Sequence, residues 1–304
     1  MKTLSWMLIA VIPLLASGER GDALPMADTP ASVINRPAPA AESLAPPADS
    51  LADLADTPSS TVDAPPSPAA SPASPACRPE RLVYTAQYNW AFIWIEAGIV
   101  EFTLSPSKEH AGAQRLFAVG RSTKDWIFRV RDTLVSHHDP DTFLPRAFSR
   151  VAHEGNYHKT FDYRWDYNRR AVYSRQERLG RNVRLDTIPL LPDTHDILSA
   201  IWMVRRLDFP AYQKNDLIPM RVLLDDKIYN LYVRYLGRER VKVSKEKRWC
   251  HVFSPLLVEG EVFKGGESMK VWVSDDEYRL PLMVEAKIVV GSVKITLEEA
   301  KSTF

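Results

Sequence analysis

The 304-residue sequence contains only two cysteines, Cys77 and Cys250, and this scarcity limits its covalent and metal chemistry. Two cysteines allow a single disulfide, which in an oxidising compartment would tie the start of the folded part to a late strand. The alternatives are that both are small buried apolar residues or that one is exposed. A metal site is not expected, because Cys250 and His251 are adjacent and adjacent strand residues point to opposite faces.

Motifs of nucleophilic and phosphate-binding enzymes are also missing. The sequence has no G-x-S-x-G elbow, no G-x-G-x-x-G loop and no Walker pattern. His153 and His158 resemble the H-E-x-x-H zinc motif, but they are five residues apart rather than four. At that spacing the two imidazoles would not share a face of a helix or strand. We therefore expect no enzyme, no cofactor and no metal.

The remaining residues that could take part in catalysis fall in predicted turns or on the predicted surface. Paired aspartates at 225–226 and 275–276 lie in turns, where Asp is favoured because it bonds the local backbone. His137, His138 and His195 are expected to be exposed. An envelope hydrolase ranks third among the functional hypotheses, because only the fold can show whether two carboxylates flank a substrate.

Aromatic residues are absent between Pro25 and Pro75, where 12 of the 23 prolines are found among Ala, Ser, Asp and Thr. Such a segment cannot bury enough apolar surface to offset its chain entropy. We expect residues 19–77 to form a disordered, extended linker. Residues 78–304 carry all the Tyr and Phe and seven of the eight Trp, which is enough for one packed domain.

The N-terminus has the composition of a secretory signal peptide, predicted over residues 1–18. Lys2 is followed by the apolar run Leu4–Leu15 and by the small residues Ala16, Ser17 and Gly18. The apolar run is too short to span a bilayer comfortably. We expect the protein to be exported, with a membrane-tethered form as the alternative.

Charge is distributed unevenly along the chain. The linker carries eight acidic residues against Arg20 and Arg36, which leaves the predicted domain with an excess of about six positive charges. These charges are spread over all the predicted strands, so nucleic acid is not expected as a partner. A solvated surface is the favoured interpretation, and contact with anionic lipid is the alternative.

Period-two alternation dominates the domain and predicts a mainly β fold: a large, strongly curved antiparallel sheet or barrel. The clearest case predicts one long strand with an aromatic face, formed by Leu82, Tyr84, Ala86, Tyr88, Trp90, Phe92 and Trp94 and interrupted by Gly98. Hairpin turns are predicted at Leu224–Lys227 and Ser274–Glu277. One helix is predicted over 194–207, capped by Asp193 or Thr194. Such a helix packs across or inside a curved sheet.

The aromatic residues on these strands allow two interpretations: a filled core, or a cavity for an apolar ligand. In the second interpretation the lining would come from strand and helix aromatics, with a short mouth segment at 126–128. The candidate lining residues are Trp90, Trp94, Trp126, Phe128, Tyr163, Trp165 and Trp202.

Several short motifs over residues 80–298 resemble the bacterial family catalogued as domain of unknown function 3108. They include Val271–Asp276, Arg279–Pro281 and Val290–Val293. The matching positions are Gly98, Arg131, Asp132, Asp196, Ser199, Trp272, Ser274, Asp275, Pro281 and Gly291. The resemblance implies a β-rich fold in the periplasm or cell envelope of a Gram-negative bacterium, with no assigned chemistry.

The leading functional hypothesis is a non-catalytic periplasmic binding or assembly module whose ligand is lipid-like or another envelope component. The second is a structural partner in an envelope protein complex. The sequence identifies neither the ligand nor the protein partner.

Overall fold

The computed structural model describes residues 78, 80–90, 93–123, 130–154, 157–243, 246–257, 266–288 and 291–302. The predicted signal peptide, the linker, Cys77, Trp126 and Phe128 lie outside these residues, as does the side chain of Trp90. Within the described residues, no helix is both long and apolar enough to cross a membrane.

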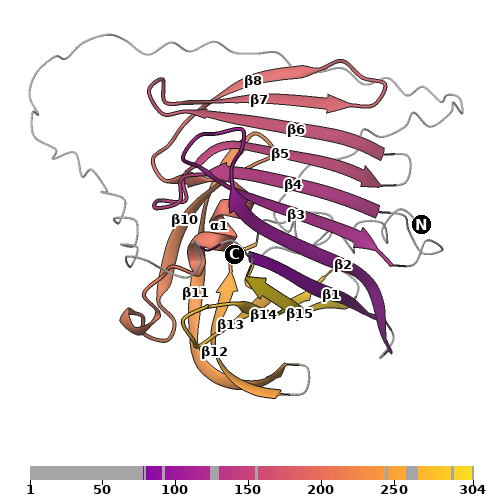
Figure 1. The fold of residues 1–304 in the computed structure, drawn as a ribbon, viewed down its shortest axis with the longest axis vertical. Helices are drawn as coiled ribbons and strands as arrows, with labels where there is room; N and C mark the ends of the chain where they lie inside the picture. Colours follow the sequence, from indigo (N-terminus) through magenta and orange to yellow (C-terminus); the bar gives the residue numbers. More distant parts are fainter. Residues whose placement is uncertain are drawn as a thin grey trace, which may run out of the picture. The chain divides into compact units, whose positions relative to one another are not determined.

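The described strands form one large sheet, which confirms the predicted mainly β, curved antiparallel fold (Figure 1). Its order is β8-β7-β6-β5-β4-β3-β2-β1-β15-β14-β13-β12-β11-β10-β9, and neighbours are antiparallel except β9 and β10. The strands are β1 (Glu80–Trp90), β2 (Ile93–Pro106), β3 (Gln114–Ser122), β4 (Val130–His138), β5 (Pro145–Glu154), β6 (Tyr157–Asp166), β7 (Ala171–Arg178), β8 (Arg184–Pro189), β9 (Thr194–His195), β10 (Leu217–Leu224), β11 (Lys227–Val243), β12 (Glu246–Pro255), β13 (Met269–Ser274), β14 (Pro281–Lys287) and β15 (Ser292–Ser302).

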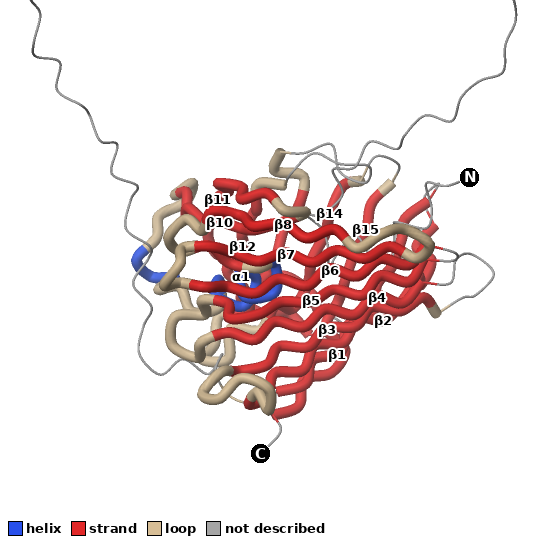
Figure 2. Tube along the Cα trace, turned by 90° about the horizontal axis from the view of Figure 1, so that it is seen from above, coloured by secondary structure: helices blue, strands red, loops and turns tan. Residues whose placement is uncertain are grey.

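Helix α1 (Ile197–Val204) lies on the inner side of the curved sheet (Figures 1 and 2), and a short 3-10 helix, η2, spans Phe209–Ala211. The predicted principal helix is therefore confirmed, but its predicted cap is wrong. Thr194 belongs to β9 and keeps the chain extended, so the helix begins later. The Asp196 side chain caps it by accepting hydrogen bonds from the backbone N–H groups of Leu198 and Ser199.

The predicted single strand over residues 82–94 is wrong, because the chain reverses within it. β1 ends at Trp90, β2 begins at Ile93, and the two strands pair antiparallel with Trp90 opposite Ile93. The aromatic alternation runs through the reversal, and no Gly, Pro, Asn or Asp lies between Trp90 and Ile93 to mark it, so the sequence pattern did not reveal it.

The two ends of the sheet order approach each other through side chains. The turn at Asp225 and Asp226 joins β10 to β11 as predicted, and both residues adopt positive φ angles of 44° and 62°. The Asp226 carboxylate accepts hydrogen bonds from Ser174 Oγ, at 2.6 Å, and from Gln176 Nε2, both on β7. Its backbone N–H donates to the Tyr163 hydroxyl on β6. This contact links the β10–β11 turn to β6 and β7 near the other edge of the sheet.

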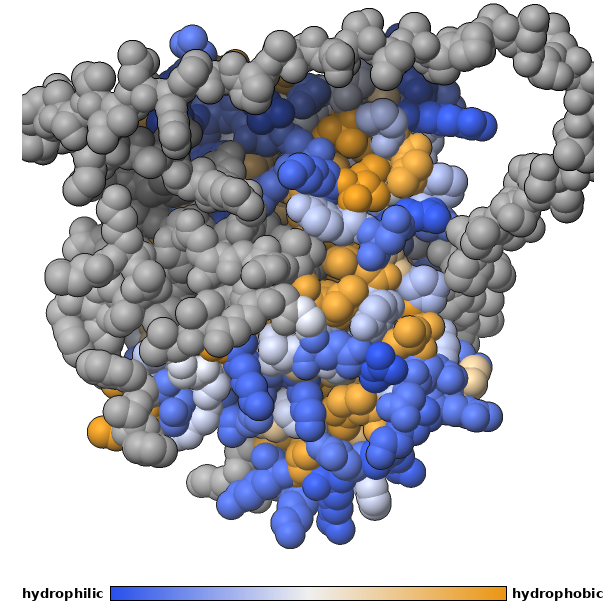
Figure 3. Space-filling model, turned by 180° about the vertical axis from the view of Figure 1, so that it is seen from behind, coloured by the Kyte–Doolittle hydropathy of each residue, from blue (hydrophilic) through white to orange (hydrophobic). Residues whose placement is uncertain are grey.

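The core lies on the inner face of the sheet. Leu82, Leu104, Leu116 and Leu134 come from β1, β2, β3 and β4 and are almost completely buried together with Trp202 of α1. The opposite face is more exposed to solvent, so strands such as β3 and β4 alternate between buried and more exposed residues. From behind, apolar side chains appear as separate clusters between hydrophilic ones, and the lower end is mostly hydrophilic (Figure 3).

Candidate ligand-binding cavity

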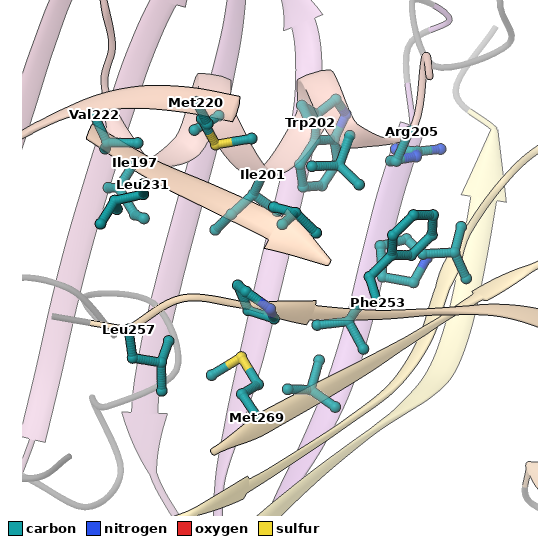
Figure 4. Close-up of a pocket in the computed structure, with 18 of the residues that line it drawn as sticks. Ile197, Ile201, Trp202, Arg205, Met220, Val222, Leu231, Phe253, Leu257 and Met269 are labelled. Carbon is teal, nitrogen blue, oxygen red and sulfur yellow. The ribbon is translucent and has the colours of Figure 1, made fainter. Parts of the chain in front are cut away.

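A cavity of about 160 Å³ lies between α1 and the inner face of the sheet (Figure 4). Its wall is built by α1, by β1 and β2, and by strands β10 to β15. Nearly all the lining side chains are aliphatic, aromatic or methionine. Apolar cavities of roughly 150 Å³ stay free of water and accept small apolar molecules. This cavity therefore has the size and chemistry of a site for part of an apolar ligand.

Helix α1 contributes Ile197, Ile201 and Trp202 to the cavity wall. Ile197 and Ile201 are four positions apart and share one side of the helix, and Trp202, next to Ile201, extends that surface around the helix. Leu198 and Ala200 are also buried, so the helix is apolar around most of its circumference. A helix that is apolar all round is buried on more than one side, which explains how α1 can contact the core and still line a cavity.

The C-terminal strands provide the facing wall. Met220 on β10 pairs with Leu231 on β11, and Val222 follows Met220 at a spacing of two, so these three side chains share a face. Phe253 of β12 and Met269 of β13 extend the same surface (Figure 4). Methionine side chains are flexible and adapt to irregular shapes. This wall can therefore adjust to ligands of different form.

A buried hydrogen-bond cluster fixes the N-terminal end of α1. Ser136 Oγ on β4 donates to Asp196 Oδ2 at 2.6 Å, while Asp196 Oδ1 accepts from Leu198 and Ser199 backbone N–H groups at 2.8 and 2.9 Å. Burial raises the pKa of Asp196 to about 6 despite these bonds, because desolvation penalises the charged carboxylate most. Asp196 thus anchors the helix to β4.

His138 and His195 lie in the same region and are buried, so the expectation that they are exposed is wrong. His137, expected to be exposed as well, is 9% exposed. Burial lowers the pKa of both His138 and His195 to about 4, and the His138 ring stacks on Phe143 at 4.9 Å. The prediction failed because the β4–β5 connection folds inward onto the helix N-terminus.

Ser199, His195 and Asp196 are close in space but lack the geometry of a catalytic triad. His195 Nδ1 lies 3.2 Å from the Phe143 carbonyl oxygen and 3.4 Å from Ser199 Oγ. A carbonyl only accepts, so the Phe143 bond requires a protonated Nδ1, which cannot take the proton of Ser199. Asp196 bonds Ser136 and the helix backbone instead of His195. The arrangement serves as a helix cap.

An ion pair anchors the other end of α1. The Arg205 guanidinium is 1% exposed and donates to both carboxylate oxygens of Glu80 on β1. It also donates to the Tyr278 and Arg279 backbone carbonyls, at 3.0 and 3.1 Å. Arg205 lines the end of the cavity, but its donors are mostly occupied by the protein. The cavity therefore ends against a satisfied ion pair, which favours an uncharged ligand end.

The structure separates the predicted lining residues. Trp202 lines the cavity. Tyr163 lines a smaller space of about 20 Å³ together with Arg150, and Trp165 borders a polar groove beside Asp139. Trp94 is 43% exposed and lies opposite Asn89, away from the buried face that carries Tyr88, because β2 contains an extra residue at the bulge opposite Ala86 and Gln87. The predicted lining set therefore does not come together at one site.

Most of the family-motif residues make contacts that stabilise the fold. Asp132 is buried and forms an ion pair with Arg150 at 2.8 Å, and desolvation raises the pKa of its carboxyl group. Arg131, its neighbour, is exposed on the other face. Gly98 lies beside the bulge and faces Ala86. Ser199 Oγ donates to the Asp196 carbonyl.

The motif residues near the C-terminus shape turns and strand ends. Ser274 Oγ donates to Asp276 and accepts from the Leu280 backbone N–H, while Asp275 accepts from His251 at 2.9 Å. The predicted turn at Ser274–Glu277 extends further, to the first residue of β14, Pro281, which borders the cavity.

Two further motif positions are explained by close packing. Trp272 Nε1 donates to Glu239 at 2.6 Å. Gly291 has φ +85°, and a Cβ there would approach the Asn89 carbonyl oxygen to 2.3 Å, so only glycine fits.

Cys250 is buried with a free thiol, and burial raises its pKa to about 11. Cys77 lies outside the described residues, so a disulfide between the two cysteines stays a prediction. Among the described residues, no three His, Cys, Asp or Glu side chains are grouped to hold a metal ion.

Most of the cavity wall was not predicted from the sequence, including Ile201, Met220, Leu231, Phe253 and Met269. These are aliphatic, sulfur-containing or single aromatic residues without an unusual local pattern. The available signal was the helix itself, whose apolar residues exceed one stripe. A helix that is apolar on a second side must face a second apolar surface, and here that surface is the far wall of the cavity.

Residues 83–298 match the family described as "Protein of unknown function (DUF3108)". No curated protein matches the chain. Among solved structures, the chain is similar to the beta-barrel-like protein of domain of unknown function DUF1849 from Brucella abortus, with a TM-score of 0.50 and 11% sequence identity. The match covers 75% of this chain and 98% of that one. This likeness concerns the fold alone.

Proposed function

Because the chain belongs to the DUF3108 family, whose description assigns no activity, we propose that it is a non-catalytic binding module of the cell envelope. Its ligand is lipid-like, and an apolar part of that ligand occupies the cavity beside α1. The observation that carries the proposal is the cavity of about 160 Å³ with an almost wholly apolar wall.

The energetics of the cavity suit an alkyl chain. Each methylene that leaves water contributes about 0.8 kcal/mol. A chain that places about five methylenes in the cavity would gain roughly 4 kcal/mol. Met220 and Met269 can adapt to such a chain, and Arg205 is already held by Glu80. These features favour a neutral hydrocarbon over a charged group at this site.

The envelope setting rests on the N-terminal sequence. Lys2, the apolar run Leu4–Leu15 and the small residues at 16–18 are typical of an export signal. The proline-rich segment that follows has the composition of a long spacer. We propose that the spacer gives the binding domain reach within the periplasm of a Gram-negative bacterium.

A structural role in an envelope complex stays a second prediction, and one observation favours it. β8 is the last strand at its end of the sheet order, and Leu185 on this strand is 73% exposed. Edge strands offer backbone groups that can pair with another chain. Binding at β8 would leave the cavity empty, so the cavity experiment separates the two roles.

The test compares two leucine-to-tryptophan substitutions in the full chain. Leu231→Trp places an indole into the cavity, whereas Leu217→Trp changes a 49% exposed position on the paired strand β10. We expect Leu231→Trp to weaken binding of the apolar fluorescent probe N-phenylnaphthylamine at least tenfold, and Leu217→Trp to change it less than twofold. Thermal unfolding of both variants checks that the fold is retained.

Native mass spectrometry of the same preparations provides a second measurement. We expect lipid to co-purify with the unmodified protein and with Leu217→Trp, and less with Leu231→Trp. Absence of co-purifying lipid together with absence of probe binding would refute the binding function and favour the edge-strand role.

A further inference from the structure

The β11–β12 hairpin extends beyond the strands on either side of it. β10 pairs with β11 only as far as Arg234, and β13 pairs with β12 only from Cys250 onward. In the described sheet, residues 240–243 and 246–249 therefore pair only with each other. Figure 1 shows this hairpin at the lower end of the sheet. It forms a two-stranded ribbon with two separate faces.

One face of the ribbon carries cations and a tryptophan. In the strand register, Arg240 lies opposite Trp249 and Lys242 opposite Lys247, with Arg238 next in line. All five side chains are exposed. We call these residues, Arg238, Arg240, Lys242, Lys247 and Trp249, the basic face. The mostly hydrophilic lower end in Figure 3 corresponds to this end of the sheet.

The other face of the ribbon serves the fold. Val243 is buried in a cluster with Cys250 and Trp272, and Val241 packs against that cluster. Glu239 accepts the Trp272 indole hydrogen bond, and Glu246 accepts from Arg248 at 2.9 Å. The ribbon's acidic side chains, Glu239 and Glu246, thus lie on this second face together with Arg248, and the basic face carries none.

Few local carboxylates balance the basic face. Arg238 pairs with Asp275, but no carboxylate among the described residues forms an ion pair with Arg240, Lys242 or Lys247. A charge pattern that served only solubility would mix both signs. Here both acidic residues of the ribbon lie on the other face, and Arg248, the one described cation on that face, is paired with Glu246. Positive potential is therefore concentrated on the basic face.

Trp249 adds an apolar group in the middle of this charge. It is 49% exposed, and the Arg238 guanidinium lies 4.7 Å from its ring centre. Tryptophan is favoured at membrane–water interfaces, where its ring lies at the level of the lipid headgroups. Basic residues around an exposed aromatic are the combination that binds anionic bilayer surfaces.

We propose that the basic face docks on the surface of an anionic phospholipid bilayer. The charges are complementary, and each Lys or Arg close to such a surface strengthens binding by about 1 kcal/mol, or roughly fivefold. The contact would hold the domain at a membrane without an inserted span. This inference depends on the hairpin alone and stands independently of what the cavity binds.

The experiment measures partitioning of the full chain onto vesicles of phosphatidylcholine with or without 30% phosphatidylglycerol. We expect binding to require the anionic lipid and to weaken as salt rises. Lys242→Gln with Lys247→Gln should lower the partition coefficient about 25-fold. Any contribution of the N-terminal apolar run is common to all variants and cancels in the comparison.

A matched double variant separates the basic face from net charge. Lys270→Gln with Lys287→Gln removes the same two charges from exposed positions on β13 and β14. We expect this variant to bind within a few-fold of the unmodified protein. Equal loss in both double variants, or binding that does not depend on phosphatidylglycerol, would overturn the proposal. Trp249→Phe and Trp249→Ala should give intermediate and larger losses, respectively.

Discussion

The two halves of the sheet bury different chemistry against α1. Strands β1 to β6 bury the charged side chains Glu80, Asp132, Arg150 and Lys159. The described parts of β10 to β15 bury no Asp, Glu, Lys or Arg, and they present aliphatic and methionine side chains to the cavity. The first half therefore supplies the side-chain anchors Ser136 and Glu80 that hold the helix, and the strands of the second half face it across apolar space.

This difference explains how a cavity can persist in a packed domain. An apolar helix normally settles until the space beside it is filled, because unfilled space costs contact energy. Here Ser136–Asp196 and Glu80–Arg205 fix the two ends of α1 with directional bonds. The position of the helix is then set by its polar anchors, and the facing wall need not close on it.

The largest effect should come from breaking the Arg205 anchor. Arg205→Met keeps apolar bulk but leaves Glu80 without its buried partner, which should cost about 3–5 kcal/mol of unfolding free energy. Urea denaturation measures the loss. Glu80→Leu combined with Arg205→Met should recover most of it, because an apolar pair replaces the ions.

The exposed ion pair Arg184–Asp186 provides the control for this comparison. Arg184→Met should cost less than about 1 kcal/mol. If Arg205→Met costs no more than this control, the ion pair does not anchor the helix.

His138 tests the polar half through its pH dependence. Its pKa is lowered to about 4 by burial, so the folded state resists a proton that the unfolded chain accepts near 6.5. Its contribution is therefore complete above pH 6.5 and is lost as the pH falls toward 4. His138→Phe should retain the stack on Phe143 and reduce the acid loss by up to about 1.4 kcal/mol per pH unit. Unfolding at pH 7, 5.5 and 4.5 measures this, and an unchanged acid slope would contradict it.

Asp196 should change the pH dependence in the opposite direction and by a smaller amount. Its pKa is raised to about 6, so its contribution to stability is complete below pH 3.8 and is lost as the pH rises through 6. Asp196→Asn preserves a good N-cap and removes this titration. Stability at pH 7 should then stay within about 1 kcal/mol of the unmodified protein or rise. If Asp196→Asn lowered the free energy of unfolding as much as Arg205→Met does, the negative charge of Asp196 would itself be needed.

Much of the architecture could be predicted from alternation alone. The mainly β curved sheet, the single principal helix and the turn at Asp225–Asp226 follow from local patterns and are confirmed. The β1–β2 reversal could not be predicted, because the alternation continues through it. The one-residue bulge lies beside Gly98, where the sequence predicts an interruption, but the local pattern does not show that this bulge moves Trp94 to the other face.

The apolar character of the cavity could be predicted, but most of the residues that line it could not. An aromatic-rich curved sheet suggested an apolar site, and Trp202 does line one. The other lining residues meet because distant parts of the chain pair, as β1 and β15 do, which carry the lining residues Tyr84 and Ile295. His138 and His195 were misplaced for the same reason, since their burial depends on how a connection folds over α1.

The side-chain contact between Asp226 and β7 has a mechanical consequence. Elsewhere the sheet is joined by ladders of backbone hydrogen bonds, but here Ser174 and Gln176 close the ring onto a single carboxylate. Opening this contact breaks a few side-chain hydrogen bonds and no backbone ladder. Each charge-assisted bond that is lost costs roughly 1–3 kcal/mol of stability. The circumference of the curved sheet is thus least costly to change where the β10–β11 turn contacts β7.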